Sequence, residues 1–268
     1  MLRKVFPFIL IALLVLMAAT WPTKASATDE KAYSMPTMAP LYGPPPNEYR
    51  DGWTMRIIFK TTPEALRELV PKPLVPNPQN IMVFINSRFF ASGLGQYNET
   101  VLSAPVEFEG KLGGYCVYLM LDHDSPIAAG REIWGFPKKL GQIKMEEKDG
   151  VLISTVERAG ITLIRAAMEL SQEVKPETVP LPGPTFNLKL IPSVKKDAPP
   201  DVMQLTSTTL ENIKVHRVYT GKATLEFGTS PADPFHKIPI KEVMGGMYMN
   251  LDFTLPYGEV IYDYLKAK

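Results

Sequence analysis

Two adjacent lysines, Lys138 and Lys139, are the residues whose types and setting best suit covalent chemistry. They lie in a glycine-bounded segment, Gly130-Arg131-Glu132-Ile133-Trp134-Gly135-Phe136-Pro137-Lys138-Lys139-Leu140-Gly141. A neutral lysine amine can attack a carbonyl carbon and form an imine. Lysine is almost fully protonated at pH 7, and burial against aromatic side chains or repulsion by a second cation favours the neutral amine. A Lys-Lys pair is also typical of a solvated surface turn, and the aromatic neighbours weaken that interpretation without excluding it.

The histidines and common catalytic motifs offer few alternatives. His123, His216 and His236 lie far apart, and none has a second His or Cys at the spacing of metal ligands. The chain has no Gly-x-Ser-x-Gly elbow, phosphate-binding loop or dinucleotide-binding fingerprint. We therefore expect a site that uses neither a metal nor an organic cofactor.

The single cysteine, Cys116, excludes an intramolecular disulfide. It is flanked by Tyr115 and Val117 in a strand-like run, and a reactive thiol needs an accessible, electropositive setting. We therefore interpret Cys116 as a packed residue rather than a nucleophile.

The N-terminus has the pattern of a secretory signal peptide. Arg3 and Lys4 precede an apolar run over residues 5–19, and Ala25-Ser26-Ala27 supplies small residues for cleavage. A retained membrane anchor is the alternative, but roughly 15 apolar residues is short for a span that needs about 20. The pattern predicts cleavage after residue 27, a periplasmic or secreted location, and no membrane contact after cleavage.

The charge balance gives no support for nucleic-acid binding. Cleavage would remove Arg3, Lys4 and Lys24 from the 29 basic residues, and with 28 acidic residues the mature chain has a formal charge of −2. A nucleic-acid-binding surface is usually strongly basic. We therefore expect a small-molecule partner.

After a Pro-rich extended lead-in, residues 28–48, the pattern predicts one domain over residues 49–268, mostly of short strands. Residues 53–61 alternate like a strand, and Thr62-Pro63-Glu64 begins a helix that ends before Pro71. Further strands are predicted at residues 81–90, 115–121, 151–157, 161–168, 186–191, 210–219, 223–227 and 248–255. This predicts an α+β fold, mostly antiparallel β, in which the sheet curls or closes with a little helix outside it.

Several segments, in the same order and with similar spacings, resemble the acetoacetate decarboxylase family. Besides residues 130–141 they are Ala65-Leu66-Arg67-Glu68-Leu69-Val70-Pro71-Lys72-Pro73-Leu74, Ser92-Gly93-Leu94-Gly95-Gln96-Tyr97-Asn98-Glu99, Asp124-Ser125-Pro126-Ile127-Ala128, Val215-His216 with Thr220-Gly221, and Glu259-Val260-Ile261-Tyr262-Asp263-Tyr264-Leu265-Lys266. The resemblance runs from about residue 50 to the C-terminus.

The resemblance implies specific roles for three residues. Lys138 corresponds to the family's Schiff-base lysine, Lys139 to the neighbouring cation, and Glu99 to a glutamate that lines the site. It also implies a closed or cone-shaped antiparallel β-barrel with flanking helices, a homo-oligomer, and a small-molecule keto acid as substrate. Four further residues are expected to contact that substrate: Trp134, Phe136, Arg50 and Phe84.

Two positions depart from the family pattern. Gly52 falls where the family decarboxylase has an arginine. Arg50 lies two residues earlier and Arg56 four residues later. We expect Arg50 to take the role of the family's arginine through a small shift. Phe84 falls where the decarboxylase has a second glutamate. The departures concern the handling of the carboxylate and of protons rather than the lysine.

Three functions are compatible with these observations. The first is an exported lyase that decarboxylates acetoacetate or a related β-keto acid to a ketone and CO2. The second is a Schiff-base aldolase- or dehydratase-like enzyme on another keto acid, suggested by Gly52 and Phe84. The third is a non-catalytic exported protein that binds a hydrophobic ligand.

Overall fold

This computed structural model describes residues 33–267, so the predicted signal peptide, 1–27, and the start of the lead-in, 28–32, lie outside the described residues. The chain divides into a first unit that ends at Leu41 and a second that spans Tyr42–Lys268. The described residues of the first unit contain bends and turns. The second unit contains all the strands and helices described below, and its first strand begins at Asn47, slightly before the predicted domain start.

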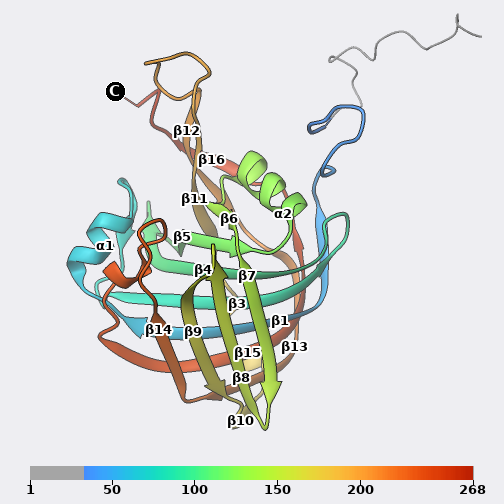
Figure 1. The fold of residues 1–268 in the computed structure, drawn as a ribbon, viewed down its shortest axis with the longest axis vertical. Helices are drawn as coiled ribbons and strands as arrows, with labels where there is room; N and C mark the ends of the chain where they lie inside the picture. Colours follow the sequence, from blue (N-terminus) through green and yellow to red (C-terminus); the bar gives the residue numbers. More distant parts are fainter. Residues whose placement is uncertain (1–32, 268) are drawn as a thin grey trace, which may run out of the picture. The chain divides into compact units, whose positions relative to one another are not determined.

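Most of the second unit is β-strand, arranged in two sheets (Figure 1). The larger sheet has twelve strands, in the order β10 (Gln172–Val174), β13 (Glu211–Gly221), β15 (Glu242–Leu255), β1 (Asn47–Lys60), β3 (Ile81–Ala91), β4 (Gly95–Phe108), β5 (Lys111–Leu121), β11 (Thr185–Ile191), β12 (Val202–Thr208) and β16 (Glu259–Asp263), with β2 (Val75–Pro76) beside β4 and β6 (Lys138–Leu140) beside β5. The smaller sheet has the order β14 (Ala223–Phe227), β9 (Ile161–Glu169), β8 (Val151–Arg158) and β7 (Gln142–Lys148). The strand pairs are antiparallel except those that β5 makes with β6 and β11.

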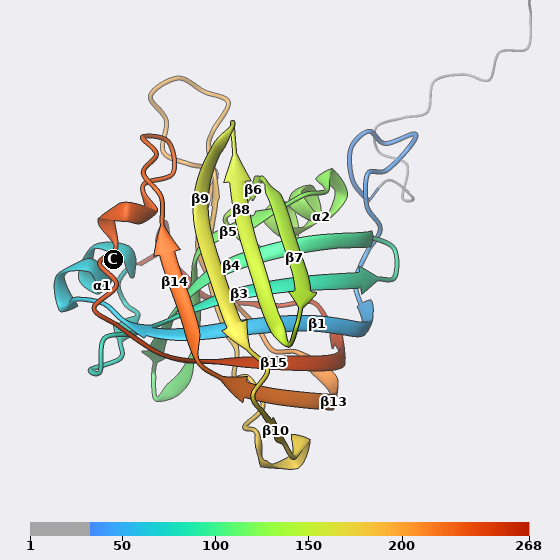
Figure 2. The ribbon, with the colours of Figure 1, turned by 60° about the horizontal axis from the view of Figure 1, so that its bottom comes forward.

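The strands of the smaller sheet run across β1, β3 and β4 rather than along them (Figure 2). An apolar cluster fills the space between the two sheets, because alternate residues of the large sheet meet apolar residues of the small one. Its buried members include Met82, Phe84, Leu102 and Met120 from the large sheet and Leu152, Val156, Leu163 and Met168 from the small sheet.

The large sheet curls but does not close. Within residues 33–267 its end strands, β10 and β16, are not paired with each other, so the prediction of a closed barrel is wrong. Closure is not needed to bury the central strands, because the smaller sheet covers one face and a second apolar cluster covers the other. The prediction of a mostly antiparallel β fold with a little helix is confirmed.

Two short α-helices flank the sheets. In α1 (Pro63–Leu69) the hydroxyl of Thr62 accepts a hydrogen bond from the Ala65 amide at 3.3 Å, as the predicted N-cap requires, and the helix ends before Pro71. The other helix, α2 (Asp124–Ala129), continues into a π-helical turn over Gly130–Trp134. Single 3-10 turns occur at Pro176–Thr178 and Phe235–Lys237. No helix among residues 33–267 has the length and apolar character needed to cross a membrane.

Each predicted strand has an observed counterpart. The predicted run at residues 223–227 matches β14, and the others match β1, β3, β5, β8, β9, β11, β13 and β15 with shifted ends. Seven strands were not predicted from the local pattern: β4, β7, β12 and β16, and the short β2, β6 and β10.

Candidate active site

The face of the large sheet turned away from the smaller sheet lines a cavity of about 330 Å³. Cavities that bind small molecules are typically apolar with a few placed polar groups. Most side chains around this cavity are apolar, and only three of them are charged: Arg56, Glu99 and Lys138. It is therefore the best candidate site in the described part of the chain.

Lys138 reaches the cavity from β6, where it pairs with Leu119 of β5. Lys138 is buried, with 7% of its surface exposed, and its Nζ lies 3.0 Å from Glu99 Oε2. The Nζ atom also lies 5.4 Å from the ring centroid of Phe136 and 5.7 Å from that of Tyr97. The cavity thus holds a lysine amine among aromatic rings, with one carboxylate in hydrogen-bond contact.

The residues before β6 create the space for this lysine. A Cβ atom on Gly130 would lie 2.4 Å from Lys138 Cε and 2.5 Å from Cδ, so a side chain there would force the end of the lysine to move. The backbone of Gly130 is ordinary right-handed helix, so glycine matters here for space and not for conformation. Arg131 Nη1 donates to the carbonyl oxygen of Lys138 at 3.1 Å and holds the strand in place.

Trp134 and Phe136 have different roles. Phe136 lines the cavity, as expected for a substrate contact. Trp134 does not line it: its Nε1 donates to the carbonyl oxygen of Pro256 at 2.9 Å, and its own carbonyl accepts from Thr206 Oγ1 at 2.6 Å. Trp134 therefore anchors the lysine segment to the rest of the sheet.

Lys139 points away from Lys138, because successive side chains of a strand face opposite sides. Its Nζ lies 2.6 Å from Oδ1 of Asp233, whose other oxygen lies 3.2 Å from Arg158 Nε. The side chain of Asp233 is only 2% exposed, so it needs these cations. The structure therefore brings Lys138 and Glu99 together but places the Lys139 charge outside the cavity.

Two buried tyrosines extend the polar part of the site. Tyr97 lies two residues before Glu99 on the same face of β4, and its Oη lies 3.0 Å from Tyr49 Oη. Burial raises the pKa of both phenols, so they stay protonated at neutral pH and can donate hydrogen bonds. Neither tyrosine was predicted as a site residue, although Tyr97 belongs to the same segment, residues 92–99, as Glu99.

Arg56, not Arg50, is the arginine that lines the cavity from β1. Burial lowers the pKa of Arg56 to about 10. Gly52 has little room for a long side chain, because a Cβ there would lie 3.1 Å from the ring of Phe89 and 3.2 Å from the carbonyl oxygen of Leu251. The signal for Arg56 was a charged residue between apolar neighbours, Met55 and Ile57, in the middle of β1.

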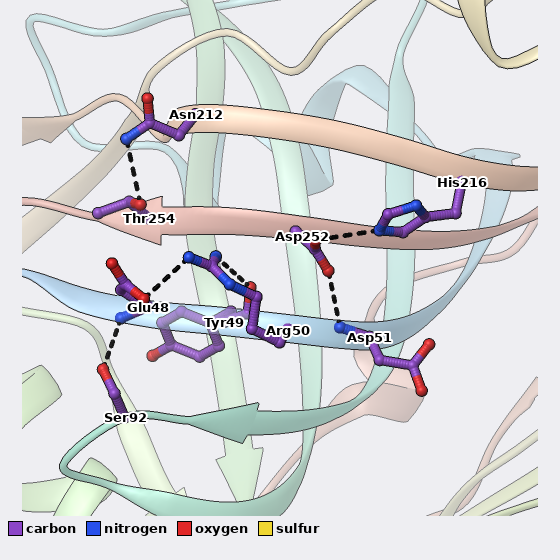
Figure 3. Close-up of polar contacts among 9 residues, drawn as sticks. All are labelled: Glu48, Tyr49, Arg50, Asp51, Ser92, Asn212, His216, Asp252 and Thr254. Carbon is purple, nitrogen blue, oxygen red and sulfur yellow. Dashed lines mark hydrogen bonds and ion pairs between the residues drawn. The ribbon is translucent and has the colours of Figure 1, made fainter.

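Arg50 and Phe84 are placed outside the cavity, so their predicted substrate contacts are not supported. Arg50 extends along β1 to Glu48, with 2.8 Å between Nη2 and Oε2 and about half of each side chain exposed (Figure 3). Phe84 is fully buried between the two sheets, because alternation along β3 turns Val83 and Ile85, rather than Phe84, into the cavity.

The cysteine and histidines add no second reactive centre. Cys116 lines the cavity and is buried, and burial raises the pKa of its thiol. Figure 3 shows His216 directed at Asp252, with 3.1 Å between Nε2 and Oδ2. Among residues 33–267 no group of three or more His, Cys, Asp or Glu side chains is arranged to hold a metal ion.

Comparisons with known proteins identify the family of this chain. The model of the acetoacetate decarboxylase family matches residues 34–265. An acetoacetate decarboxylase of Burkholderia cenocepacia (strain HI2424) is 35% identical over 246 residues, which cover 90% of this chain and 99% of the relative.

Solved structures show the same fold. The crystal structure of acetoacetate decarboxylase from Legionella pneumophila is 32% identical, with a TM-score of 0.82 over 90% of this chain and 99% of that chain. The enduracididine biosynthesis enzyme MppR, complexed with the condensation product of pyruvate and imidazole 4-carboxaldehyde, has a TM-score of 0.78 over 91% of this chain and 100% of that chain at 21% identity. The extent of the match to the family model and the identity to curated relatives show that this chain belongs to the acetoacetate decarboxylase family.

Proposed function

We propose that this protein is a lyase that decarboxylates acetoacetate or a related β-keto acid through an imine on Lys138. The observation that carries the proposal is the position of the Lys138 amine, buried in an apolar cavity and 3.0 Å from a carboxylate oxygen of Glu99. Family membership supports the same chemistry.

The reaction begins when the neutral amine of Lys138 attacks the substrate's keto carbon. Glu99 is placed to accept the ammonium proton and to return a proton as the carbinolamine loses water. The resulting iminium ion lies two bonds from the carboxylate carbon. The carbon–carbon bond then breaks, CO2 leaves, and the electron pair forms an enamine.

The second half returns the enzyme to its starting state. The enamine takes a proton on carbon, which regenerates an iminium ion, and water releases the ketone and the free amine. Because the cavity lining is mostly apolar, water is restricted around the charged intermediates. Tyr97, whose ring centroid lies 5.7 Å from the amine, can hydrogen-bond through its hydroxyl to the substrate or to this water.

A Schiff-base aldolase or dehydratase is the second candidate. It is favoured by Gly52, where the structure leaves little room for the family's arginine, and by Phe84, which is buried outside the cavity. MppR, which shares the fold, was solved with a condensation product of pyruvate. Such an enzyme would form the same imine on Lys138 without releasing CO2.

Export is a separate proposal that rests on the sequence of residues 1–27. Sequencing the N-terminus of the protein isolated from its natural host tests it, and a mature chain that begins at Thr28 is expected. A chain that retains residues 1–27 would contradict it. The proposed homo-oligomer is tested by measuring the mass of the purified protein in solution.

The central experiment is mass spectrometry of the protein after incubation with acetoacetate and sodium borohydride, with CO2 release followed in parallel. The proposal predicts a reduced adduct on Lys138 together with CO2. An adduct without CO2 would favour the aldolase or dehydratase. Neither signal from folded protein would contradict both and favour a protein that binds a hydrophobic ligand.

A further inference from the structure

Arg56 and Lys138 face the same cavity at the same level of its wall. A continuous series of cross-strand pairs links them, from Arg56 on β1 through Ile85 on β3, Val101 on β4 and Leu119 on β5 to Lys138 on β6. Both end residues of this series line the cavity. A molecule that reacts at Lys138 therefore lies in the space that Arg56 also faces.

The guanidinium of Arg56 has no charge partner among residues 33–267. Its Nε is buried without a hydrogen-bond acceptor, whereas Lys138 is matched by Glu99. Two hydroxyl side chains that line the cavity from β1 and β3, Thr54 and Ser87, are hydrogen-bonded to each other with 3.2 Å between their oxygens. The charged lining of the cavity thus carries one unmatched positive charge.

A buried, unpaired cation is unfavourable until an anion binds to it. Guanidinium groups suit carboxylates in particular, because their N–H donors match the two carboxylate oxygens. One unmatched charge fits a ligand with a single negative charge. We propose that Arg56 binds the carboxylate of a monoanionic keto acid while the keto group reacts with Lys138.

The keto acid in this inference rests on the proposed function, whereas anion binding by Arg56 does not. If the carboxylate leaves as CO2, its bonding electrons remain on the enamine and the ketone product is uncharged. Loss of CO2 therefore removes the carboxylate that Arg56 binds. Arg56 therefore favours binding of the substrate over binding of the product.

Binding of butanoate tests the inference, because butanoate has a carboxylate but no keto group and cannot form an imine. Calorimetry would compare wild type with Arg56→Met and with Arg50→Met, which removes a guanidinium from the same strand outside the cavity. We expect Arg56→Met to bind butanoate about 10- to 100-fold more weakly, the usual effect of losing a charged hydrogen-bond partner. Arg50→Met should bind it like wild type, and neutral butanamide should bind all three proteins equally.

Unchanged butanoate affinity in Arg56→Met, or no butanoate binding by wild type, would overturn the inference. Removal of an unpaired buried cation should not impair folding, which circular dichroism would check. Arg56→Gln is a second neutral variant for which the same loss is expected. If Arg56→Met does not fold, equal butanoate affinity in Arg56→Gln and wild type overturns the inference.

The failure of this inference is distinguishable from failure of the decarboxylase proposal. Absence of imine and CO2 with acetoacetate contradicts the decarboxylase but leaves the butanoate result valid. In an active enzyme, Arg56→Met should raise KM by about tenfold or more and change kcat by less than about threefold. A fall in kcat with unchanged KM would contradict a binding role.

Discussion

The central strands of the large sheet bury two faces that differ in how their polar groups are satisfied. On the face toward the smaller sheet, Asn86 donates to Ser154 at 2.6 Å and accepts from Thr100 at 2.8 Å. On the cavity face, Arg56 Nε has no partner within residues 33–267 and the Lys138 amine has one carboxylate. Alternate residues of the same strands supply both faces.

The packed face therefore contributes to stability, and the cavity face holds the groups that bind or react with a ligand. Buried polar groups that are fully hydrogen-bonded fix a unique packing, whereas incompletely satisfied groups are expected where a ligand completes them. Substitutions on the packed face should therefore change the free energy of unfolding. Substitutions on the cavity face should change binding or turnover.

The largest effect is expected for Lys138. Lys138→Ala and Lys138→Arg should abolish both imine trapping and CO2 release, because neither residue supplies a neutral amine. Lys139→Met is the matched control and should still form the borohydride-stable adduct. An adduct in Lys138→Ala would refute the assignment.

Glu99→Gln should slow turnover by roughly 10²- to 10⁴-fold, because an amide cannot take the proton from the lysine. The folded structure should persist, since the side chains are of similar shape. Steady-state CO2 release measures the effect, with Glu107→Gln, near the exposed end of β4 and outside the cavity lining, as the control. Full turnover in Glu99→Gln would remove Glu99 from the mechanism.

Phe84 and Ile85 are adjacent residues of β3 that face opposite sides, so substitutions at these two positions compare the two faces directly. Phe84→Ala should lower the free energy of unfolding by about 3–5 kcal/mol, because it leaves a cavity between the sheets, while kcat of the folded enzyme stays unchanged. Ile85→Ala should cost less stability and alter KM instead. Chemical denaturation and steady-state kinetics measure both, and equal destabilisation by the two variants would break the comparison.

The smallest effect is expected for the contribution of Cys116 to the pH dependence of the free energy of unfolding. Burial raises the pKa of its thiol in the folded state, so above about pH 8.5 the unfolded chain releases a proton that the folded chain keeps. The thiol's contribution to stability is therefore complete below that pH and declines by about 1.4 kcal/mol per pH unit above it. Denaturation at several pH values should show a steeper alkaline decline for wild type than for Cys116→Ala, and parallel curves would contradict burial of a neutral thiol.

Local patterns predicted the elements that they control directly. The N-cap at Thr62 and the proline after it defined α1, and turn residues on both sides defined β14. β4 was missed because its sequence mixes polar residues with Pro105 and has no clear apolar alternation. The absence of closure depends on which strands pair across the sheet, and a local pattern does not contain that information.

The residues of the candidate site that were predictable are those in the two segments that resemble the family, residues 92–99 and 130–141. Lys138, Glu99 and Phe136 all line the cavity, whereas Lys139, expected to act beside Lys138, faces elsewhere because adjacent residues of a strand point to opposite sides. Selecting Arg56 instead of Arg50 required knowledge of the irregularity between them, because simple alternation would put both residues on the same face of β1. The register of β1 shifts after Tyr49 where it pairs with β15 and β3, two strands distant in sequence, so a local pattern does not predict the shift.

The two lysines of β6 also affect how insertions and deletions should be interpreted in relatives. The first two positions of the strand each hold an amine, one beside Glu99 and one beside Asp233. A slip of β6 by one residue along β5 can bring Lys139 to the place of Lys138, beside Glu99, and it then turns Lys138 to the opposite face. The distance along the chain from Gly130, whose missing Cβ leaves room for Lys138, therefore identifies the reactive lysine better than the Lys-Lys letters do. In a relative whose turn before β6 is shorter by one residue, the second lysine of the pair would take the place of Lys138.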